Sequence, residues 1–108
     1  MWILESTGVA STTFTFRILP GTMKNMGRAP GADFVVDAAL VSRLHCRLTV
    51  DPDDRLHVED LDSTNGTWVN GRKVARAPLQ AGDLLKVGRV EFEVKDGSRV
   101  PSDGSDTV

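Results

Sequence analysis

The sequence predicts an all-β fold, and among all-β folds a β-sandwich. Four segments alternate apolar and polar residues with a period of two, the pattern of strands that bury one face and expose the other. Their apolar residues are Phe14, Phe16 and Ile18; Leu44, Cys46, Leu48 and Val50; Leu56 and Val58; and Val90, Phe92 and Val94. Turn-forming residues separate the segments at short intervals, which is typical of a sandwich or a barrel. Of the two we expect the sandwich.

The predicted turns contain residues that tolerate the backbone angles of tight turns. They are Pro20-Gly21, Ala29-Pro30-Gly31, Asp51-Pro52-Asp53-Asp54, Asn70-Gly71 and Gly88-Arg89. Asn70-Gly71 predicts a two-residue hairpin, because both residue types accept a positive φ. The run from Asp51 to Asp54 lacks the spacing of a calcium loop, so we expect a solvated hairpin tip there.

The segment from Asp37 to Leu48 is ambiguous on pattern alone. It fits a strand from Leu44 to Val50, but its apolar residues also fit one stripe of a helix that Asp37 could cap. The residues on that stripe are Ala38, Ala39, Leu40, Val41, Leu44 and Leu48. Periodicity favours neither structure.

The composition indicates one small domain. The chain has 108 residues and a formal net charge of -2, from 13 Lys and Arg against 15 Asp and Glu. Nucleic acid as a main partner is disfavoured, because phosphate-backbone binding needs a basic excess. The single cysteine, Cys46, indicates a reducing compartment. With no signal peptide pattern and no membrane-spanning apolar run, we expect a cytoplasmic protein that does not bind a membrane.

Residues 97–108 are rich in Gly, Ser, Asp and Pro and show no periodicity. This composition predicts a disordered tail or the start of a linker. The folded domain is therefore expected to span residues 1–96.

Three predicted loops carry side chains suited to one phosphate group. Arg28 follows a strand, Ser42-Arg43 precede another, and Ser63 to Thr67 lie between two more. A phosphothreonine carries a charge of about -1.5 to -2 and three acceptor oxygens at neutral pH. Arginines supply charge and forked donors, and hydroxyls and main-chain N–H groups of a glycine-containing loop supply further donors.

In this order and spacing, the motifs resemble those of forkhead-associated (FHA) domains. The matching stretches are Gly27-Arg28, Ser42-Arg43-Leu44-His45, Asp62 to Gly71, and the later Leu79, Gly82-Asp83 and Gly88. The resemblance extends from about Trp2 to Val94. Two departures are small: Cys46 stands where Ala is usual and should face the core, and Trp68 replaces a more typical Phe.

The resemblance implies an eleven-stranded antiparallel β-sandwich of the FHA/SMAD-like class, with the binding site on loops at one end. It also places Ser42 on a loop between strands, so that the helical pattern of the ambiguous segment is misleading. The implied site residues fall into three groups. In the first group, Arg28 and Ser42 contact the phosphate and Arg43 and Thr64 assist. In the second, Asn65 holds the main chain of a bound peptide and Asn70 helps further along the peptide. In the third, Gly27, His45 and Gly66 support the site.

The implied function is phosphothreonine-dependent protein binding in Ser/Thr kinase signalling, without catalysis. The expected partner is a threonine-phosphorylated protein or peptide, the protein is expected to be monomeric, and no metal or cofactor is expected. The main alternative is a phosphorylation-independent scaffold that uses the same loops or a sheet face.

Three other interpretations are weaker. A hydrolase using Ser42 and His45 lacks the Gly-x-Ser-x-Gly motif and an evident oxyanion loop. A zinc site of His45, Cys46 and His57 is disfavoured because successive strand residues face opposite sides. Some members of the family dock a phosphorylated threonine of their own, but Ser11-Thr12-Thr13 and Thr15 are better explained as outward-facing strand residues.

Overall fold

The computed structural model describes residues 1–7 and 13–97, which contain eleven strands and no α-helix. In chain order the strands are β1 (Trp2–Ser6), β2 (Thr15–Ile18), β3 (Thr22–Gly27), β4 (Phe34–Val35), β5 (Cys46–Val50), β6 (Leu56–Asp60), β7 (Thr67–Val69), β8 (Arg72–Val74), β9 (Arg76–Leu79), β10 (Leu84–Val87) and β11 (Val90–Asp96).

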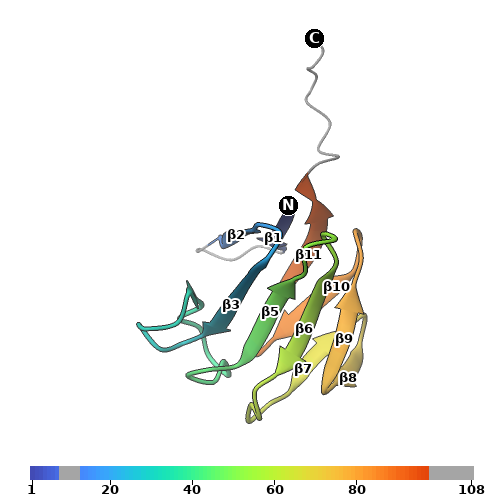
Figure 1. Ribbon diagram of the computed structural model, residues 1–108. Helices are drawn as coiled ribbons and strands as arrows, with labels where there is room; N and C mark the ends of the chain where they lie inside the picture. Colours follow the sequence, from blue (N-terminus) through green and yellow to red (C-terminus); the bar gives the residue numbers. More distant parts are fainter. Residues whose placement is uncertain (8–12, 98–108) are drawn as a thin grey trace.

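The strands form two sheets that pack face to face. One has six strands in the order β2-β1-β11-β10-β7-β8, and the other has five in the order β4-β3-β5-β6-β9 (Figure 1). The predicted eleven-stranded β-sandwich is confirmed. One pairing differs from the antiparallel prediction: β4 runs parallel to β3, with Met26 opposite Phe34. The pair is only two residues long because the loop after β3 arches out and returns beside the same strand.

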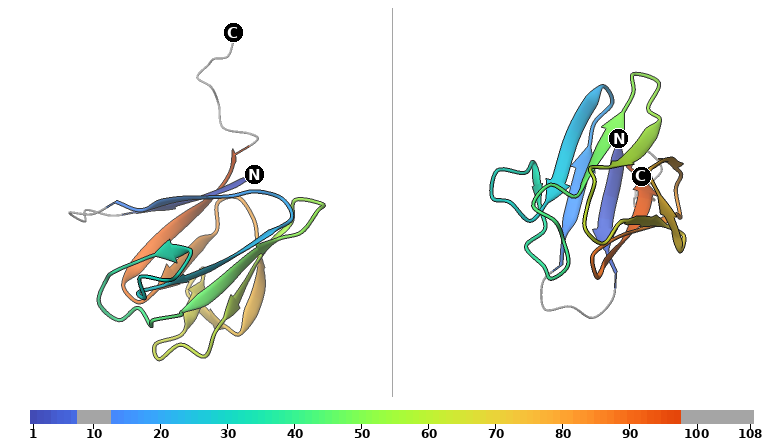
Figure 2. Two further views of the ribbon diagram at one scale, coloured as in Figure 1. Left: turned by 60° about the vertical axis from the view of Figure 1, so that its left-hand side comes forward. Right: turned by 90° about the horizontal axis from the view of Figure 1, so that it is seen from below.

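The predicted alternation places apolar side chains between the two sheets, the two layers visible in Figure 2. Leu4, Met26, Leu48, Leu85 and Phe92 are fully buried. Phe16 of the six-stranded sheet stacks on Phe34 of the five-stranded sheet, with ring centroids 4.5 Å apart. Stacked aromatic pairs bury large areas with a preferred geometry, so this pair fixes the two sheets against each other.

The ambiguous segment forms neither a helix nor a long strand. Residues 37–45 are irregular, and β5 begins only at Cys46. The prediction that Leu44 faces the core is wrong, because Leu44 is 48% exposed and the neighbouring His45 is buried instead. Period-two alternation could not predict that His45 is buried in place of Leu44. The burial of His45 depends on the hydrogen bonds of its ring, which link separate segments of the chain.

The predicted hairpin at Asn70-Gly71 is confirmed. It joins β7 to β8, with φ of 51° at Asn70 and 82° at Gly71. Pro52 and Asp53 at the tip between β5 and β6 are exposed, as predicted, while Asp54 contacts the first residues of the chain. The Trp2 indole N–H donates to the Asp54 carbonyl at 2.9 Å, and the Met1 amino group lies 3.1 Å from the Asp54 carboxylate. This tip therefore holds β1 in place.

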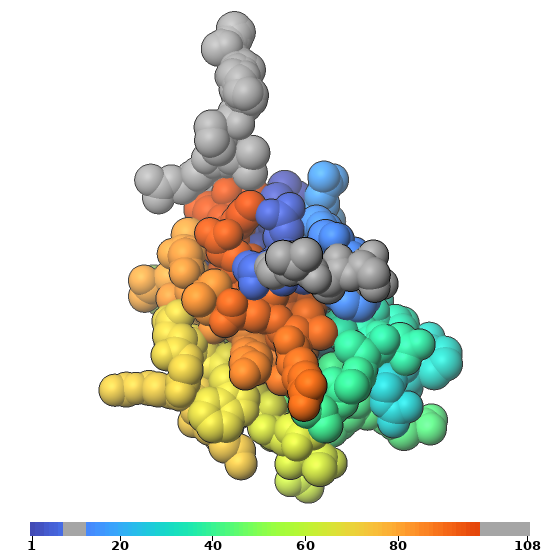
Figure 3. Space-filling view, turned by 180° about the vertical axis from the view of Figure 1, so that it is seen from behind, coloured from blue at the N-terminus to red at the C-terminus, as the bar shows by residue number. Residues whose placement is uncertain are grey.

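The two ends of the described fold lie together, opposite the long loops. The Gly97 N–H donates to the Met1 carbonyl at 2.9 Å. Residues 28–45 and 61–66 lie at the other end of the sandwich (Figure 1). In the space-filling view residues 61–66 are at the lower edge and residues 28–45 at the lower right (Figure 3). Thr13 and Thr15 are exposed as expected. Ser11, Thr12 and all but the first residue of the predicted tail at 97–108 lie outside the described residues.

Within residues 1–7 and 13–97, no helix has the length and apolar character needed to cross a membrane.

The Cys46 side chain faces the core, as expected, and is fully buried. Burial, with a smaller contribution from the negative charge of Asp60, raises the pKa of its thiol from 9.0 to about 12. The folded protein therefore keeps the thiol protonated at pH values where the unfolded chain loses the proton.

Because the unfolded thiol ionises first, the free energy of unfolding should fall as the pH rises from 9.0 towards 12, by up to about 1.4 kcal/mol per pH unit. Chemical denaturation across this range should show that loss in the wild type and a smaller loss in Cys46→Ala, which lacks the thiol. A chromogenic disulfide reagent should label Cys46 only as fast as the protein unfolds. Immediate labelling of the native protein would contradict this account.

Candidate functional site

Three loops meet at the end of the sandwich remote from Met1 (Figure 1). They connect β3 to β4, β4 to β5, and β6 to β7. Together they line an open depression of about 550 Å³ formed by Arg28, Leu40, Val41, Ser42, Arg43, Leu44, Asp62, Thr64 and Asn65. All four residues predicted to bind phosphate line this depression, and so does Asn65. The sequence motifs are therefore brought together in space.

Arg28 is tied to the loop between β4 and β5 by two bonds. Its backbone N–H donates to the Ser42 carbonyl at 2.9 Å, and its side-chain Nε–H donates to the Val41 carbonyl at 3.1 Å. Among the described residues, the remaining N–H groups of the guanidinium have no protein acceptor. Arg28 thus presents a positioned, positively charged fork of donors on the depression.

Ser42 is positioned by His45 and Thr64. The Ser42 N–H donates to His45 Nδ1 at 3.1 Å, and the Thr64 N–H donates to Ser42 Oγ at 3.0 Å. Since Oγ accepts from Thr64, its own hydrogen remains available to donate into the depression.

The His45 imidazole connects two of the loops from inside the protein. Nδ1 accepts from Ser42, so the proton of the neutral ring lies on Nε2, which is 2.8 Å from the Gly66 carbonyl. Both ring nitrogens are therefore occupied by backbone groups. His45 cannot take a proton from Ser42 Oγ in this arrangement, which removes the base that a serine hydrolase would need.

The Asp60 carboxylate organises the loop between β6 and β7. It accepts from the hydroxyls of Ser63 (2.5 Å) and Thr67 (2.7 Å) and from the Ser63 N–H (3.1 Å). Burial alone raises the pKa of Asp60, but these hydrogen bonds, with the nearby His45, outweigh it and hold the pKa below its usual value. Asp60 therefore stays ionised and keeps the loop folded.

Three backbone donors of this loop are used by internal hydrogen bonds. The N–H groups of Ser63, Thr64 and Gly66 donate to Asp60, Ser42 Oγ and Ser63 Oγ respectively. Gly66 has a φ of 86° and the Lys73 side chain lies directly over it, so a Cβ at this position would come within 2.7 Å of Lys73 Cε. The N–H groups of Ser63, Thr64 and Gly66 are therefore not available to an anion at this site.

The two asparagines differ in placement. The Asn65 amide N–H donates to the Leu40 carbonyl at 3.0 Å, which holds the side chain at the edge of the depression. Asn70 does not line the depression. Its amide N–H donates to Asp83 at 3.0 Å, and its carbonyl accepts from the Leu84 N–H at 2.9 Å. The structure thus brings Asn65, but not Asn70, to the phosphate-site residues.

Sequence reasoning assigned no role to Asp62 and Leu40, which also line the depression. Both have a positive φ, 59° at Asp62 and 69° at Leu40. Such angles are unusual for leucine and cluster at functional sites. Nothing in the local sequence indicates them, because the angles arise from the packing of one loop on another.

Gly27 lets the strand before Arg28 approach the loop that carries Arg43. A Cβ at this position would lie 2.0 Å from the Arg43 carbonyl oxygen and 2.9 Å from Leu44 Cα, both backbone atoms. Only a residue without a side chain allows the short bonds from Arg28 and Ala29 to this loop.

Gly27→Ala should lower the free energy of unfolding by about 3 kcal/mol or more, because the backbone it strikes cannot move aside. Gly31→Ala is the matched control in the following loop, where an added Cβ meets nothing within 4 Å. That variant should change stability by less than about 1 kcal/mol. Equal melting temperatures for the two variants would show that the backbone at Arg43 and Leu44 can move to make room for a Cβ at position 27.

The described residues contain no group of three or more His, Cys, Asp or Glu side chains that could hold a metal ion. The arrangement offers two arginines and two hydroxyls to an anion and no activated nucleophile. Side chains of this kind are able to bind an anion by charge-assisted hydrogen bonds.

Comparisons with known proteins agree with this geometry. The glycogen accumulation regulator GarA of Mycobacterium tuberculosis is 30% identical over 90 residues, covering 83% of this chain and 55% of GarA. The chain spans about half or less of the length of the curated relatives it matches first.

Solved structures match across most of the chain. The FHA domain of the CT664 protein from Chlamydia trachomatis superposes with a TM-score of 0.82 at 29% identity, covering 88% of this chain and 96% of that one. A structure from a study of phosphothreonine-dependent FHA domain interactions superposes with a TM-score of 0.75 at 29% identity, covering 88% and 95%. The family model of the FHA domain matches residues 25–88. The chain belongs to the FHA domain family.

Proposed function

We propose that this chain is a phosphothreonine-dependent protein interaction module of Ser/Thr kinase signalling. The observation that carries the proposal is the depression of about 550 Å³ into which three loops bring Arg28, Ser42, Arg43 and Thr64. Family membership and the likeness to a domain studied for phosphothreonine-dependent interactions support it. The partner is a threonine-phosphorylated protein or peptide.

In this proposal the phosphate is bound by charge-assisted hydrogen bonds. Arg28 and Ser42 donate directly to the phosphate oxygens. Arg43, beside Ser42 on the same loop, and Thr64, on the loop between β6 and β7, assist. Each such bond to a charged group contributes about 1.5–3 kcal/mol. Since the N–H groups of Ser63, Thr64 and Gly66 are already used, selection of the phosphorylated form depends mainly on these four side chains.

Other residues contact the rest of the peptide. Asn65, at the edge of the depression, bonds the peptide main chain. The predicted contact from Asn70 further along the peptide stays a prediction, because its amide is engaged by Asp83 and Leu84. Val41, buried and lining the depression, offers an apolar contact to the methyl group that distinguishes threonine from serine.

We place the module in the cytoplasm as a monomer, with no cofactor and no chemical change in its ligand. The free Cys46 suits a reducing compartment, and GarA, named as a regulator, is consistent with binding rather than catalysis. Affinity for a single peptide should be micromolar, about -8 kcal/mol.

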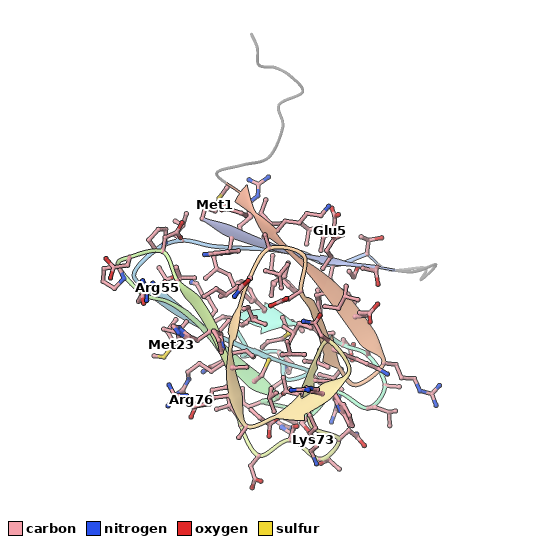
Figure 4. All side chains as sticks on the ribbon, turned by 90° about the vertical axis from the view of Figure 1, so that its right-hand side faces the viewer. Met1, Glu5, Met23, Arg55, Lys73 and Arg76 are labelled. Atoms are coloured by element: carbon pink, nitrogen blue, oxygen red, sulfur yellow. The ribbon has the colours of Figure 1, made fainter. Side chains whose placement is uncertain are left out.

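Arg28→Ala and Ser42→Ala should each weaken binding of a phosphothreonine peptide by about 10- to 100-fold, because each removes a charge-assisted bond. Isothermal titration calorimetry with phosphothreonine, phosphoserine and unmodified versions of one peptide measures the effect. Arg55→Ala is the matched control, since Arg55 is exposed toward the Met1 end of the molecule (Figure 4). It should bind as the wild type does.

Equal affinity for modified and unmodified peptides would overturn the proposal. Undiminished capture of a partner after phosphatase treatment would favour a phosphorylation-independent scaffold.

Asp62 places a negative charge on the same depression as the phosphate. Asp62→Asn should therefore tighten phosphopeptide binding by about two- to threefold at low salt, and the gain should shrink at about 1 M salt as screening increases. Asparagine tolerates the positive φ at this position, so the fold should be unaffected. Asp53→Asn at the opposite hairpin tip controls for net charge; an equal gain there would exclude a local effect.

A further inference from the structure

A row of three side chains crosses the outer face of the six-stranded sheet. Lys73 of β8 and Lys86 of β10 stand directly opposite Trp68 of β7, one on each side of it. Val69 and Leu85, their neighbours along two of these strands, are buried between the sheets, so the row faces away from the core. We call these three residues the Trp68 row. Figure 3 shows this face, with β7 and β8 (yellow) beside β10 (orange) and above the loop of residues 61–66.

The Trp68 row borders a hollow of about 320 Å³. The hollow is lined by Trp68, Gly71, Leu84, Lys86 and Glu91. Leu84 is 36% exposed there, and the Glu91 carboxylate is turned toward Thr7, whose hydroxyl donates to it at 3.1 Å. An aromatic ring and an aliphatic side chain therefore form apolar walls that one apolar side chain of a partner can cover.

The two lysines of the row are exposed and unpaired. Within residues 1–7 and 13–97, neither ammonium group forms a hydrogen bond or an ion pair. The whole chain has a net charge of -2, so this end of the molecule, which also holds Arg28 and Arg43, is positive against the overall balance. On the next strand of the same face, β11, the charge reverses at Glu91 and Glu93. An acidic ligand is therefore attracted to β7, β8 and β10 and repelled from β11.

Two contacts join the Trp68 row to the phosphate site. The Trp68 indole N–H donates to the Asn65 carbonyl at 3.1 Å, and Asn65 lines the depression at the phosphate site. The Lys73 side chain lies over Gly66, the residue after Asn65. A chain that leaves the phosphate site past Asn65 therefore passes directly onto the row.

We propose that the Trp68 row and its hollow form a second contact surface for the same threonine-phosphorylated partner. The surface binds a segment that combines acidic residues with one apolar side chain. The apolar side chain fills the hollow against Trp68 and Leu84, and the carboxylates face the two lysines. Charge complementarity and continuity with Asn65 identify this occupant. Nucleic acid fits less well, because the face turns acidic at β11 and the chain as a whole is negative.

This inference rests on the proposed function and adds to it a contact that a short phosphopeptide does not make. The test compares, by fluorescence anisotropy, a short phosphothreonine peptide with versions extended at one end or the other. Each extension has about ten residues, including one leucine and several aspartates and glutamates, because an extended chain advances about 3.4 Å per residue and must cross three strands.

One of the two acidic extensions should tighten binding about three- to tenfold at low salt, since the second contact forms at a high effective concentration. The gain should shrink at about 1 M salt, where the lysines are screened. It should also be smaller when lysines replace the acidic residues, or when serine replaces the leucine.

Variants on the row and in the hollow locate the contact. Lys86→Glu and Leu84→Asp should each abolish the gain and leave binding of the short phosphopeptide unchanged. The matched controls lie at the far edge of the same sheet: Arg17→Glu on the exposed side of β2, and Leu19→Asp in the turn after β2, where Leu19 is 57% exposed. Both controls should keep the gain. Melting temperatures confirm that all variants are folded.

The outcomes separate this inference from the proposed function. If neither extension tightens binding, or if the gain survives Lys86→Glu and Leu84→Asp, the second surface is overturned and the proposed function stands. Loss of phosphate dependence with the short peptide overturns the proposed function itself. Single-stranded RNA that binds through Lys86, or a concentration-dependent dimer that Leu84→Asp disrupts, in either case without a gain from the extensions, assigns the row to another occupant and overturns the inference.

Discussion

The binding end of the molecule depends on one buried imidazole. His45 accepts a hydrogen bond from the Ser42 N–H and lies 2.8 Å from the Gly66 carbonyl, so it joins loops that are more than twenty residues apart in the chain. A buried polar ring without these partners would cost about 1–3 kcal/mol for each unsatisfied group. With them, the same ring fixes the backbone on both sides of the depression. Its burial also turns Leu44 outward.

Two further constraints complete the frame around His45. Gly27 permits one strand to contact the Arg43 backbone directly, and the ionised Asp60 holds the Ser63 and Thr67 hydroxyls. The result is a set of loops whose backbone groups largely satisfy one another. What remains for a ligand is a small group of charged and hydroxyl side chains at fixed positions around the depression.

The sequence was sufficient to predict the sandwich and its hairpin at Asn70-Gly71. It was also sufficient to predict which side chains gather at the depression, namely Arg28, Ser42, Arg43, Thr64 and Asn65. Strand periodicity and turn chemistry are local, and the motif spacing marked the loops. The remaining features depend on contacts between loops. Leu44 could not be placed by alternation because His45 took the interior position, and the positive φ of Leu40 and Asp62 has no local signature. Asn70 was expected near the peptide, yet its amide bonds are made to Asp83 and Leu84, which only the tertiary structure brings beside it.

The hydrogen bond from the Gly97 N–H to the Met1 carbonyl has a topological consequence. Because the two ends of the sandwich meet, the domain could be spliced into a loop of another protein without spreading the host backbone, and a short linker between the ends would permit circular permutation. The recognition loops would then point away from the junction. The depression and the loops that line it would be carried along unchanged, because they lie at the other end of the sandwich.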